Sequence, residues 1–236
     1  MLIDLHVHSH HTTGCTLAPR SLVRRAKEVG LDGVVLTDLN TLEGLEEIRS
    51  AGREEGLLAL CGLELATDRG HYLCFFPDPS RTPAPPQIFG SAMPWPVRDV
   101  LAKVREMGGV VVAAHPYDKT IERPSGDVIF TLDGLCAIEA ADHMSLPCVG
   151  ASGAHELSDI GKAATLFRDP VTSEADLVAQ LRSGTVFSVA IGVTPGAAPG
   201  SDRGERRDRR DGDRDRGVRR GGDRDRGGRR GGRGQR

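Results

Sequence analysis

Short apolar segments alternate with segments of helical periodicity along most of this 236-residue chain, and this alternation limits the folds open to it. The first apolar segment is LIDLHV at residues 2–7, and residues 18–30 follow it with Leu22, Ala26 and Val29 on one helical face. Gly30 is typical of a helix end. Such an alternation favours an α/β fold with a parallel sheet, either closed into a barrel or doubly wound.

The same pattern predicts the other elements. The expected strands cover residues 31–38, 57–65, 71–76, 110–116, 132–141, 146–155 and 185–191, and the expected helices cover 40–56, 96–109 and 172–184. Asn40 or Thr41 is expected to cap the second helix, which Gly56 ends. Pro96 is expected at the start of the third helix, and Ser173 is expected to cap the last.

The end of the chain differs in composition from the rest. After Ala198 the only strongly apolar residue is Val218. From residue 200 on there are 15 Arg against 8 Asp and Glu, whereas the preceding residues carry 16 Lys and Arg against 25 Asp and Glu. A segment of this kind cannot bury enough apolar surface to offset the entropy lost on ordering. We therefore expect one acidic folded domain at residues 1–196 and a disordered Arg/Gly/Asp-rich tail at residues 197–236.

Several classes of protein do not fit the composition. The five cysteines are scattered and form no CxxC pair, so they predict neither a disulfide framework nor a zinc ribbon. The N-terminus lacks a charged and then apolar leader, and no apolar run reaches the length of a membrane span. The expectation is a cytoplasmic protein without a membrane partner, whose acidic domain is not an obvious nucleic-acid binder.

Polar side chains of one chemical kind follow the predicted strands. The residues at or just past a strand end are His6, His8, Asp38, Glu64, His115, Glu139 and His155. In a parallel α/β barrel the carboxyl ends of the strands form the active-site face. We therefore expect these residues, which lie up to about 150 positions apart, to converge on one rim.

Their chemistry points to a metal centre. His6 and His8 are two residues apart on a strand, so both rings face the same side and can hold one cation. Glu64 is a candidate bridging carboxylate, which would allow two cations to lie about 3.5–4 Å apart. His115 follows four apolar residues and is either a ligand or a satisfied core histidine, and the neighbouring candidates favour the ligand.

The order and the sequences of the motifs resemble those of the PHP (polymerase and histidinol phosphatase) superfamily. The motifs are DLHVHS at 4–9, GLDGVVLTD at 30–38, GLELATDRGH at 62–71, AAHPY at 113–117, GASGAH at 150–155 and IGKAAT at 160–165. The resemblance covers nearly all of residues 1–190. It implies a distorted (β/α)7 barrel, usually with three divalent metals in the cleft at the C-terminal strand ends. It also implies hydrolysis of phosphoesters, which in the superfamily include phosphomonoesters, nucleotides and nucleic-acid ends.

Position by position, the resemblance implies a ligand set. His6, His8 and Glu64 would bind the first metal, Glu64 would bridge to the second, and His71 and His115 would complete the second site. His155 matches the last histidine of the superfamily's Ser-Asp-Ala-His motif. A metal-bound hydroxide would attack phosphorus in line. The expected cofactors are two divalent cations, and these ligands suit Zn, Mn and Fe alike.

Three positions depart from the superfamily pattern. Thr13 stands where an acidic residue is common, Leu39 replaces the histidine of Thr-Asp-His, and Gly153 replaces the aspartate of Ser-Asp-Ala-His. The first two changes remove ligands of a third metal, and the third weakens the first site. His11 and Asp38 are possible substitute ligands; the alternatives are a solvent-facing loop histidine and a cap for the helix near residue 41.

These patterns leave three hypotheses open. The favoured one is a metal-dependent phosphoesterase that hydrolyses a phosphomonoester or phosphodiester, either a small molecule or a nucleotide. The second is a catalytically degenerate PHP domain that serves as a scaffold or regulatory module. The third is an RNA-associated protein that works through its Arg/Gly-rich tail, because such segments bind nucleic acid weakly. The tail is equally compatible with a solubilising role.

Overall fold

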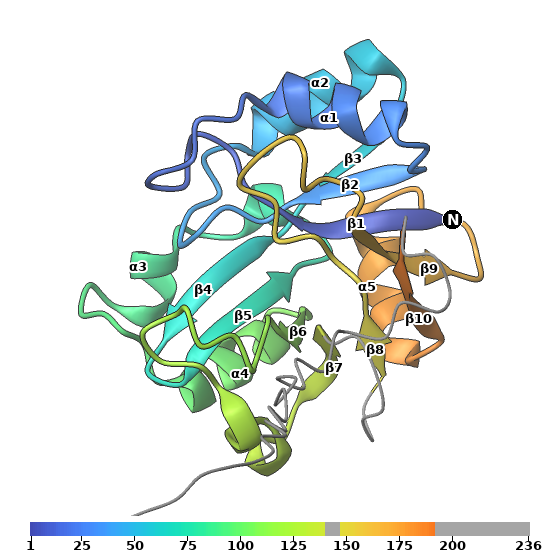
Figure 1. The fold of residues 1–236 in the computed structure, drawn as a ribbon. Helices are drawn as coiled ribbons and strands as arrows, with labels where there is room; N and C mark the ends of the chain where they lie inside the picture. The colour runs from blue at the N-terminus through green and yellow to red at the C-terminus, as the bar shows by residue number, and fades with distance from the viewer. Residues whose placement is uncertain (140–146, 192–236) are drawn as a thin grey trace, which may run out of the picture. The chain divides into compact units, whose positions relative to one another are not determined.

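The computed structural model describes residues 1–139 and 147–191, which form two five-stranded sheets with helices packed around them (Figure 1). The strand order of the first sheet is β10-β9-β1-β2-β3 and that of the second is β4-β5-β6-β7-β8. The first sheet comprises β1 (Leu2–Val7), β2 (Gly33–Leu36), β3 (Leu58–Cys61), β9 (Ala163–Phe167) and β10 (Val186–Ala190). The second comprises β4 (Leu63–Thr67), β5 (Gly70–Phe75), β6 (Val110–Ala113), β7 (Leu135–Glu139) and β8 (Cys148–Val149).

The predicted α/β class is confirmed, but the strands are only partly parallel. β1, β2 and β3 are parallel, as are β6, β7 and β8. β5 is antiparallel to both β4 and β6, and β9 is antiparallel to both β1 and β10. The turn between β4 and β5 is too short for a helical crossover, so these two strands must run in opposite directions.

The expected closed barrel is not formed by backbone pairing among the described residues. The sheets approach each other at two edges instead. An isolated bridge pairs Leu39 with Glu64 beside β2 and β4. At the other edge, the Thr165 hydroxyl of β9 donates to the Gly150 carbonyl at 2.8 Å and accepts from the Gly150 N–H at 3.1 Å. These links keep the strand ends of both sheets close to one another.

Helices cover the outer faces of the sheets and one end of the inner core. The longer helices are α1 (Pro19–Glu28), α2 (Leu45–Glu55), α4 (Val97–Glu106) and α5 (Glu174–Ser183), and the short ones are α3 (Pro85–Phe89), η1 (Pro79–Arg81) and η2 (Gly126–Thr131). The predicted cap of the last helix is confirmed, since the Ser173 hydroxyl accepts from the Asp176 N–H. The predicted stop at Gly56 is also confirmed, with φ of 67°.

The predicted start of the second helix is wrong by several residues. The helix begins at Leu45, and neither Asn40 nor Thr41 caps it. Asn40 instead has φ of 59°, and its side-chain oxygen accepts from the Ala66 N–H of β4 at 2.9 Å. The residue thus ties the loop after β2 to the next sheet, and its left-handed backbone cannot begin a helix.

Two strands near the end of the described chain also differ from expectation. The strand expected at 146–155 is only Cys148–Val149, because the following Gly-Ala-Ser-Gly lacks the bulky side chains that favour a strand. β9 at Ala163–Phe167 was not predicted. It pairs between β1 and β10, so tertiary pairing decides a segment whose local pattern is weak. The predicted disordered tail lies outside the described residues.

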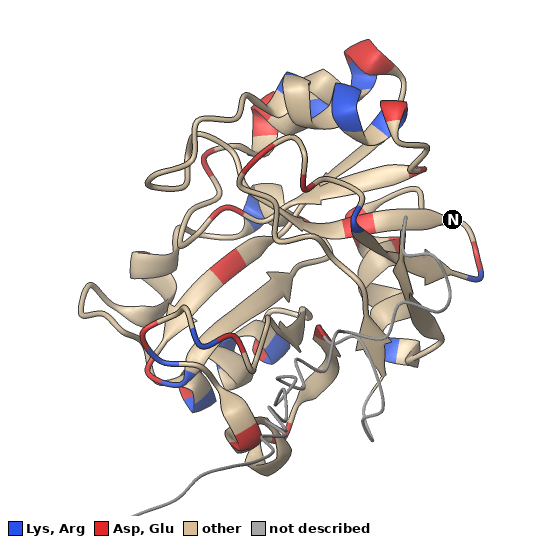
Figure 2. Ribbon diagram, viewed as in Figure 1, with Lys and Arg blue, Asp and Glu red and all other residues tan. Residues whose placement is uncertain are grey.

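Charge is distributed unevenly over the fold. Lys and Arg lie on the helices and loops, and no named strand contains either residue (Figure 2).

The strands supply the core between the sheets, where Ile3, Leu5, Val112 and Phe167 are almost wholly buried together with one face of α5. Each such side chain contributes about 1.5–3 kcal/mol of burial free energy. No described helix is both long enough and apolar enough to cross a membrane.

Asp4 of β1 is a buried carboxylate that joins three parts of the chain. It accepts from the N–H groups of Ser152 at 2.9 Å, His6 at 3.3 Å and Gly161 at 3.3 Å. Burial raises the pKa of Asp4 to about 6, and its hydrogen bonds oppose that shift. We expect Asp4→Ala to lower the free energy of unfolding by about 3 kcal/mol, because buried donors are left unpaired. Urea denaturation measures this loss.

Asp32 provides the matched control. Its carboxylate also accepts a backbone N–H, that of Leu2 at 2.7 Å, but at an exposed position. Water can replace the lost acceptor there, so Asp32→Ala should cost less than about 1 kcal/mol. Equal losses in the two variants would show that the hydrogen bonds of Asp4 do not hold residues 152 and 161 against β1.

Candidate metal centre

Glu64 lies at the centre of the candidate site, on β4 and only 3% exposed. Its Oε1 lies 3.0 Å from His71 Nδ1 and 3.1 Å from His115 Nε2. The same Oε1 lies 3.5 Å from His6 Nε2, and Oε2 lies 3.4 Å from His8 Nε2. Four imidazole nitrogens from β1 with its following loop, β5 and the loop after β6 therefore surround one carboxylate, three of them at Oε1 and that of His8 at Oε2.

A chain of hydrogen bonds determines which nitrogen of His8 carries the proton. The Thr12 hydroxyl donates to Asp38 Oδ1 at 2.7 Å. Its oxygen must therefore accept from the two groups that also contact it, the Leu39 N–H at 3.0 Å and His8 Nδ1 at 3.1 Å. The proton of neutral His8 thus lies on Nδ1, and the lone pair of its Nε2 faces Glu64 and His6.

Glu139 has the corresponding role for His6. Both carboxylate oxygens of Glu139, at the end of β7, lie near His6 Nδ1, at 3.1 Å and 3.3 Å. Glu139 Oε2 also accepts from the backbone N–H of His115 at 2.8 Å. One carboxylate therefore positions the ring of one candidate ligand and the backbone of another. His115 has φ of 26°, an uncommon conformation that this bond helps to hold.

The pKa values reflect this crowding of charge. Burial would lower the pKa of His6, but the Glu139 and Glu64 carboxylates raise it well above its usual value. Burial and the neighbouring His6 charge lower the pKa of His8 to about 3. Burial would raise the pKa of Glu64, but His6, His115 and His71 hold it well below its usual range. Without a cation, the proton between the two Nε2 atoms, 3.0 Å apart, belongs to His6; a cation would have to displace it.

The donor set fits a divalent cation. One ligand atom each from His6, Glu64 and His115 lie within 4.8 Å of one another, and imidazole and carboxylate together suit Zn, Mn and Fe. His115 Nδ1 is buried without a hydrogen-bond partner among the described residues. A buried polar atom of this kind needs a partner, which bound water or an ion can supply. The residues that the chain presents here can therefore hold a metal.

The remaining predicted residues lie around this cluster. The exposed ring of His155 stacks on His8 with centroids 4.2 Å apart. Asp38 has both oxygens occupied, because it accepts from the N–H and the hydroxyl of Ser9, each at 2.7 Å, as well as from Thr12. His11 Nε2 lies 3.1 Å from Glu47 Oε1 of α2. The structure thus places Asp38 behind His8, and it places His11 against α2.

Two residues of the site were not among the predicted ligands. The sequence shows Glu139 as a polar residue at the end of a predicted strand. That position is the signal that could have marked it as part of the site. Thr12 offered no signal, since a threonine two residues before a glycine is ordinary in a loop.

Three positions depart from the superfamily pattern, and the structure shows where each lies. Thr13 is exposed. Leu39 contributes its N–H to Thr12 rather than a side-chain ligand. Gly153 has φ of 60°, and a Cβ there would lie 3.9 Å from His6 Nδ1.

Comparison with known proteins finds relatives that match parts of the chain. A curated but uncharacterised protein of Methanocaldococcus jannaschii is 29% identical over 143 residues, which are 56% of this chain and 77% of that protein. A 5'-3' exoribonuclease of Haemophilus influenzae is 37% identical over 65 residues, only 28% of this chain and 23% of that enzyme.

A solved structure shows the same fold. The crystal structure of a protein from Bifidobacterium adolescentis, provisionally assigned as a metal-dependent phosphoesterase, aligns with a TM-score of 0.55 at 22% identity. The alignment covers 77% of this chain and 96% of that one.

Two family models match most of the chain. The model of the PHP domain family matches residues 4–123, and that of the PHP-associated family matches residues 136–186. The chain belongs to the PHP domain family.

Proposed function

We propose that this protein is a metal-dependent phosphoesterase with two divalent cations in its cleft. The observation that carries the proposal is the Glu64 carboxylate, each of whose two oxygens lies within 3.5 Å of at least one imidazole nitrogen. His6, His8 and Glu64 would hold the first cation, and Glu64, His71 and His115 the second. Such a pair supplies the positive charge that stabilises phosphoryl transfer. The assignment of the Bifidobacterium protein is consistent with this reaction class.

The surrounding residues act on the ligands rather than on the substrate. Glu139 keeps the proton of His6 on Nδ1, and Asp38 does the same for His8 through Thr12. Carboxylates in this outer position fix the tautomer and orientation of ligating histidines. Because Asp38 already accepts three hydrogen bonds from Ser9 and Thr12, and because His11 contacts α2, we propose two cations rather than three. His155, stacked on His8, would then border the cleft.

Hydrolysis of simple esters tests the proposal. The full chain, stripped with EDTA and dialysed, should hydrolyse p-nitrophenyl phosphate or bis(p-nitrophenyl) phosphate after addition of Mn²⁺, Zn²⁺ or Fe²⁺. It should be inactive before that addition. A protein that binds two equivalents of metal and yet hydrolyses neither ester would contradict the proposal and favour the scaffold hypothesis.

Restoring the missing family aspartate should strengthen the site. Gly153 has open space, with His6 Nδ1 at 3.9 Å as the nearest atom to an added Cβ. Asp tolerates the left-handed backbone there at a cost of about 1 kcal/mol. We expect Gly153→Asp to bind Mn²⁺ about 10-fold more tightly in a calorimetric titration, because a carboxylate joins the first site. Gly153→Asn has the same shape without the charge; equal affinities in the two variants would refute this expectation.

A further inference from the structure

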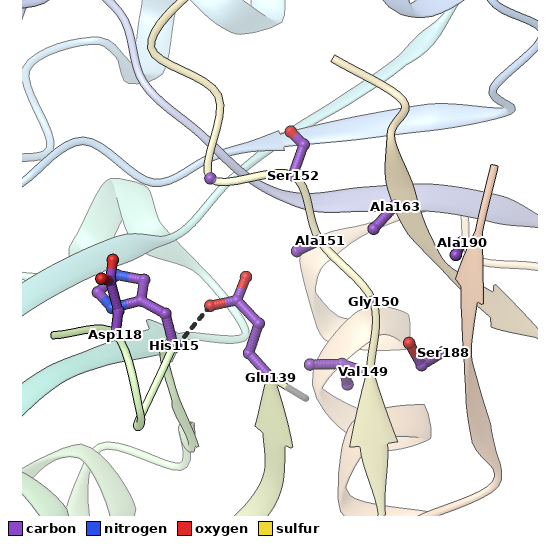
Figure 3. A pocket seen from close by; sticks show the side chains of 11 residues that line it. His115, Asp118, Glu139, Val149, Gly150, Ala151, Ser152, Ala163, Ser188 and Ala190 are labelled. Atoms are coloured by element: carbon purple, nitrogen blue, oxygen red, sulfur yellow. Dashed lines mark hydrogen bonds between the residues drawn. The ribbon is translucent and has the colours of Figure 1, made fainter. Parts of the chain in front are cut away.

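A cavity of about 410 Å³ opens directly beside the candidate metal centre. Its walls come from the ends of β7 and β8 on one side and from β9 and β10 on the other (Figure 3). This volume lies within the range of about 300–1,000 Å³ typical of small-molecule sites. His115 and Glu139, which belong to the metal centre, also line it. An ester whose phosphoryl group lies at the metals can therefore extend its leaving group into this cavity.

The lining of the cavity is mostly small and apolar. Val149, Ala151, Ala163 and Ala190 supply aliphatic surface, and two glycines leave backbone exposed between them. The Ser188 hydroxyl of β10 borders the cavity and has no hydrogen bond among the described residues. An apolar ring system with at least one hydroxyl or carbonyl group would match these walls.

Charge narrows the class of leaving group further. Among the described residues that line the cavity, the ionisable ones are His115, Asp118 and Glu139, and none is Lys or Arg. A second phosphate in this cavity would meet two carboxylates and no cationic side chain of the described lining. Burial of an unpaired charge is unfavourable, and nearby like charges add to the penalty.

We infer that this cavity binds the uncharged, ring-bearing leaving group of a phosphomonoester, of about the size of a nucleoside. The inference rests on the proposed function, because the phosphoryl group is placed at the metal centre. It excludes substrates with a second phosphate on the leaving group, such as nucleoside bisphosphates and the inner residues of an oligonucleotide. It thereby names the substrate class that the proposed function leaves open.

Paired substrates test the charge argument. With the Mn²⁺-loaded full chain, kcat/KM for adenosine 5'-monophosphate should exceed that for adenosine 3',5'-bisphosphate by at least about 10-fold. Methyl phosphate, whose leaving group does not reach the cavity, measures the basal reaction. If methyl phosphate, p-nitrophenyl phosphate and bis(p-nitrophenyl) phosphate are all inert, the proposed function fails; if only the diester reacts, the present inference of a phosphomonoester is overturned. If the monoesters react but the bisphosphate is hydrolysed as fast as the monophosphate or faster, only the present inference is overturned.

Filling the cavity tests its location. Ala151→Leu and Ala163→Leu each add three carbon atoms inside it, and they should raise KM for adenosine 5'-monophosphate at least about 10-fold. Methyl phosphate turnover should not change. Ala102→Leu, on the outer helix α4, is the matched control and should leave both substrates unaffected. Unchanged KM in both cavity variants would overturn the inference.

A binding measurement keeps the inference testable without turnover. Saturation-transfer NMR should detect free adenosine on the wild-type full chain and lose the signal in Ala151→Leu and Ala163→Leu. Circular dichroism checks that each variant folds. Adenosine that binds equally to the wild type and to both folded variants would place the nucleoside elsewhere and overturn the assignment of this cavity.

Discussion

Replacing Glu64 with glutamine is expected to lower phosphoesterase activity by more than about 100-fold, the largest effect of any substitution considered. Loss of an outer partner of a metal ligand typically costs about 10–100-fold, and Glu64 is a central contact rather than an outer one. Its Oε1 lies within 3.5 Å of nitrogens of His6, His71 and His115, and its Oε2 lies 3.4 Å from His8 Nε2. Glutamine keeps the size but has only one oxygen, so it cannot serve both cations. Initial rates with p-nitrophenyl phosphate at saturating Mn²⁺ measure the effect.

The control for this substitution is Glu106→Gln at the exposed end of α4. It removes the same charge far from the cleft and should leave the rate unchanged. Thermal unfolding of both variants distinguishes loss of the site from loss of the fold. A folded Glu64→Gln protein that retains more than about a tenth of the wild-type rate would show that this carboxylate does not bridge the reacting centre.

Glu139→Gln is expected to weaken metal binding by about 10–100-fold, as is typical for an outer carboxylate that orients a ligating histidine. Glu139 accepts from His6 Nδ1 and from the His115 N–H. The amide nitrogen of glutamine would face one of these donors, so one bond must break. Calorimetric titration with Mn²⁺ gives the change in dissociation constant.

A second readout separates positioning from general damage. Because Glu139 acts through its neighbours, the activity of Glu139→Gln should recover substantially as Mn²⁺ is raised to saturation, whereas that of Glu64→Gln should not. Asp133→Asn, an exposed carboxylate just before β7, is the matched control and should bind metal normally. An unchanged dissociation constant in Glu139→Gln would remove this residue from the site.

The sequence predicted much of the fold through local signals. The capping serine at Ser173 and the glycine at Gly56 act within one turn of their helices, so they could be read without the rest of the chain. β9 could not be read this way, because its place depends on β1 and β10, which lie far away in sequence. The antiparallel pairing of β4 and β5 follows from the short turn between them, but the alternation of strands and helices elsewhere favoured a parallel sheet.

Some residues of the candidate site can likewise be predicted from the sequence, and others cannot. Histidines at strand ends are visible because position and residue type coincide, as for His6 and His115. The tautomer of His8 depends on Thr12 and Asp38, two ordinary residues that only the folded chain brings together. The sequence leaves Asp38 open as a substitute ligand or a helix cap, and in the structure its two oxygens accept hydrogen bonds from Ser9 and Thr12. Spacing alone could not reveal that arrangement.

Metal content per chain tests the central claim most directly. The full chain should be loaded with excess Mn²⁺ or Zn²⁺, freed of unbound metal by gel filtration and measured by elemental analysis together with protein concentration. A bridged pair at Glu64 predicts two equivalents in the wild type. One equivalent or none, unchanged by further addition of either metal, would contradict the two-cation centre and with it the proposed phosphoesterase.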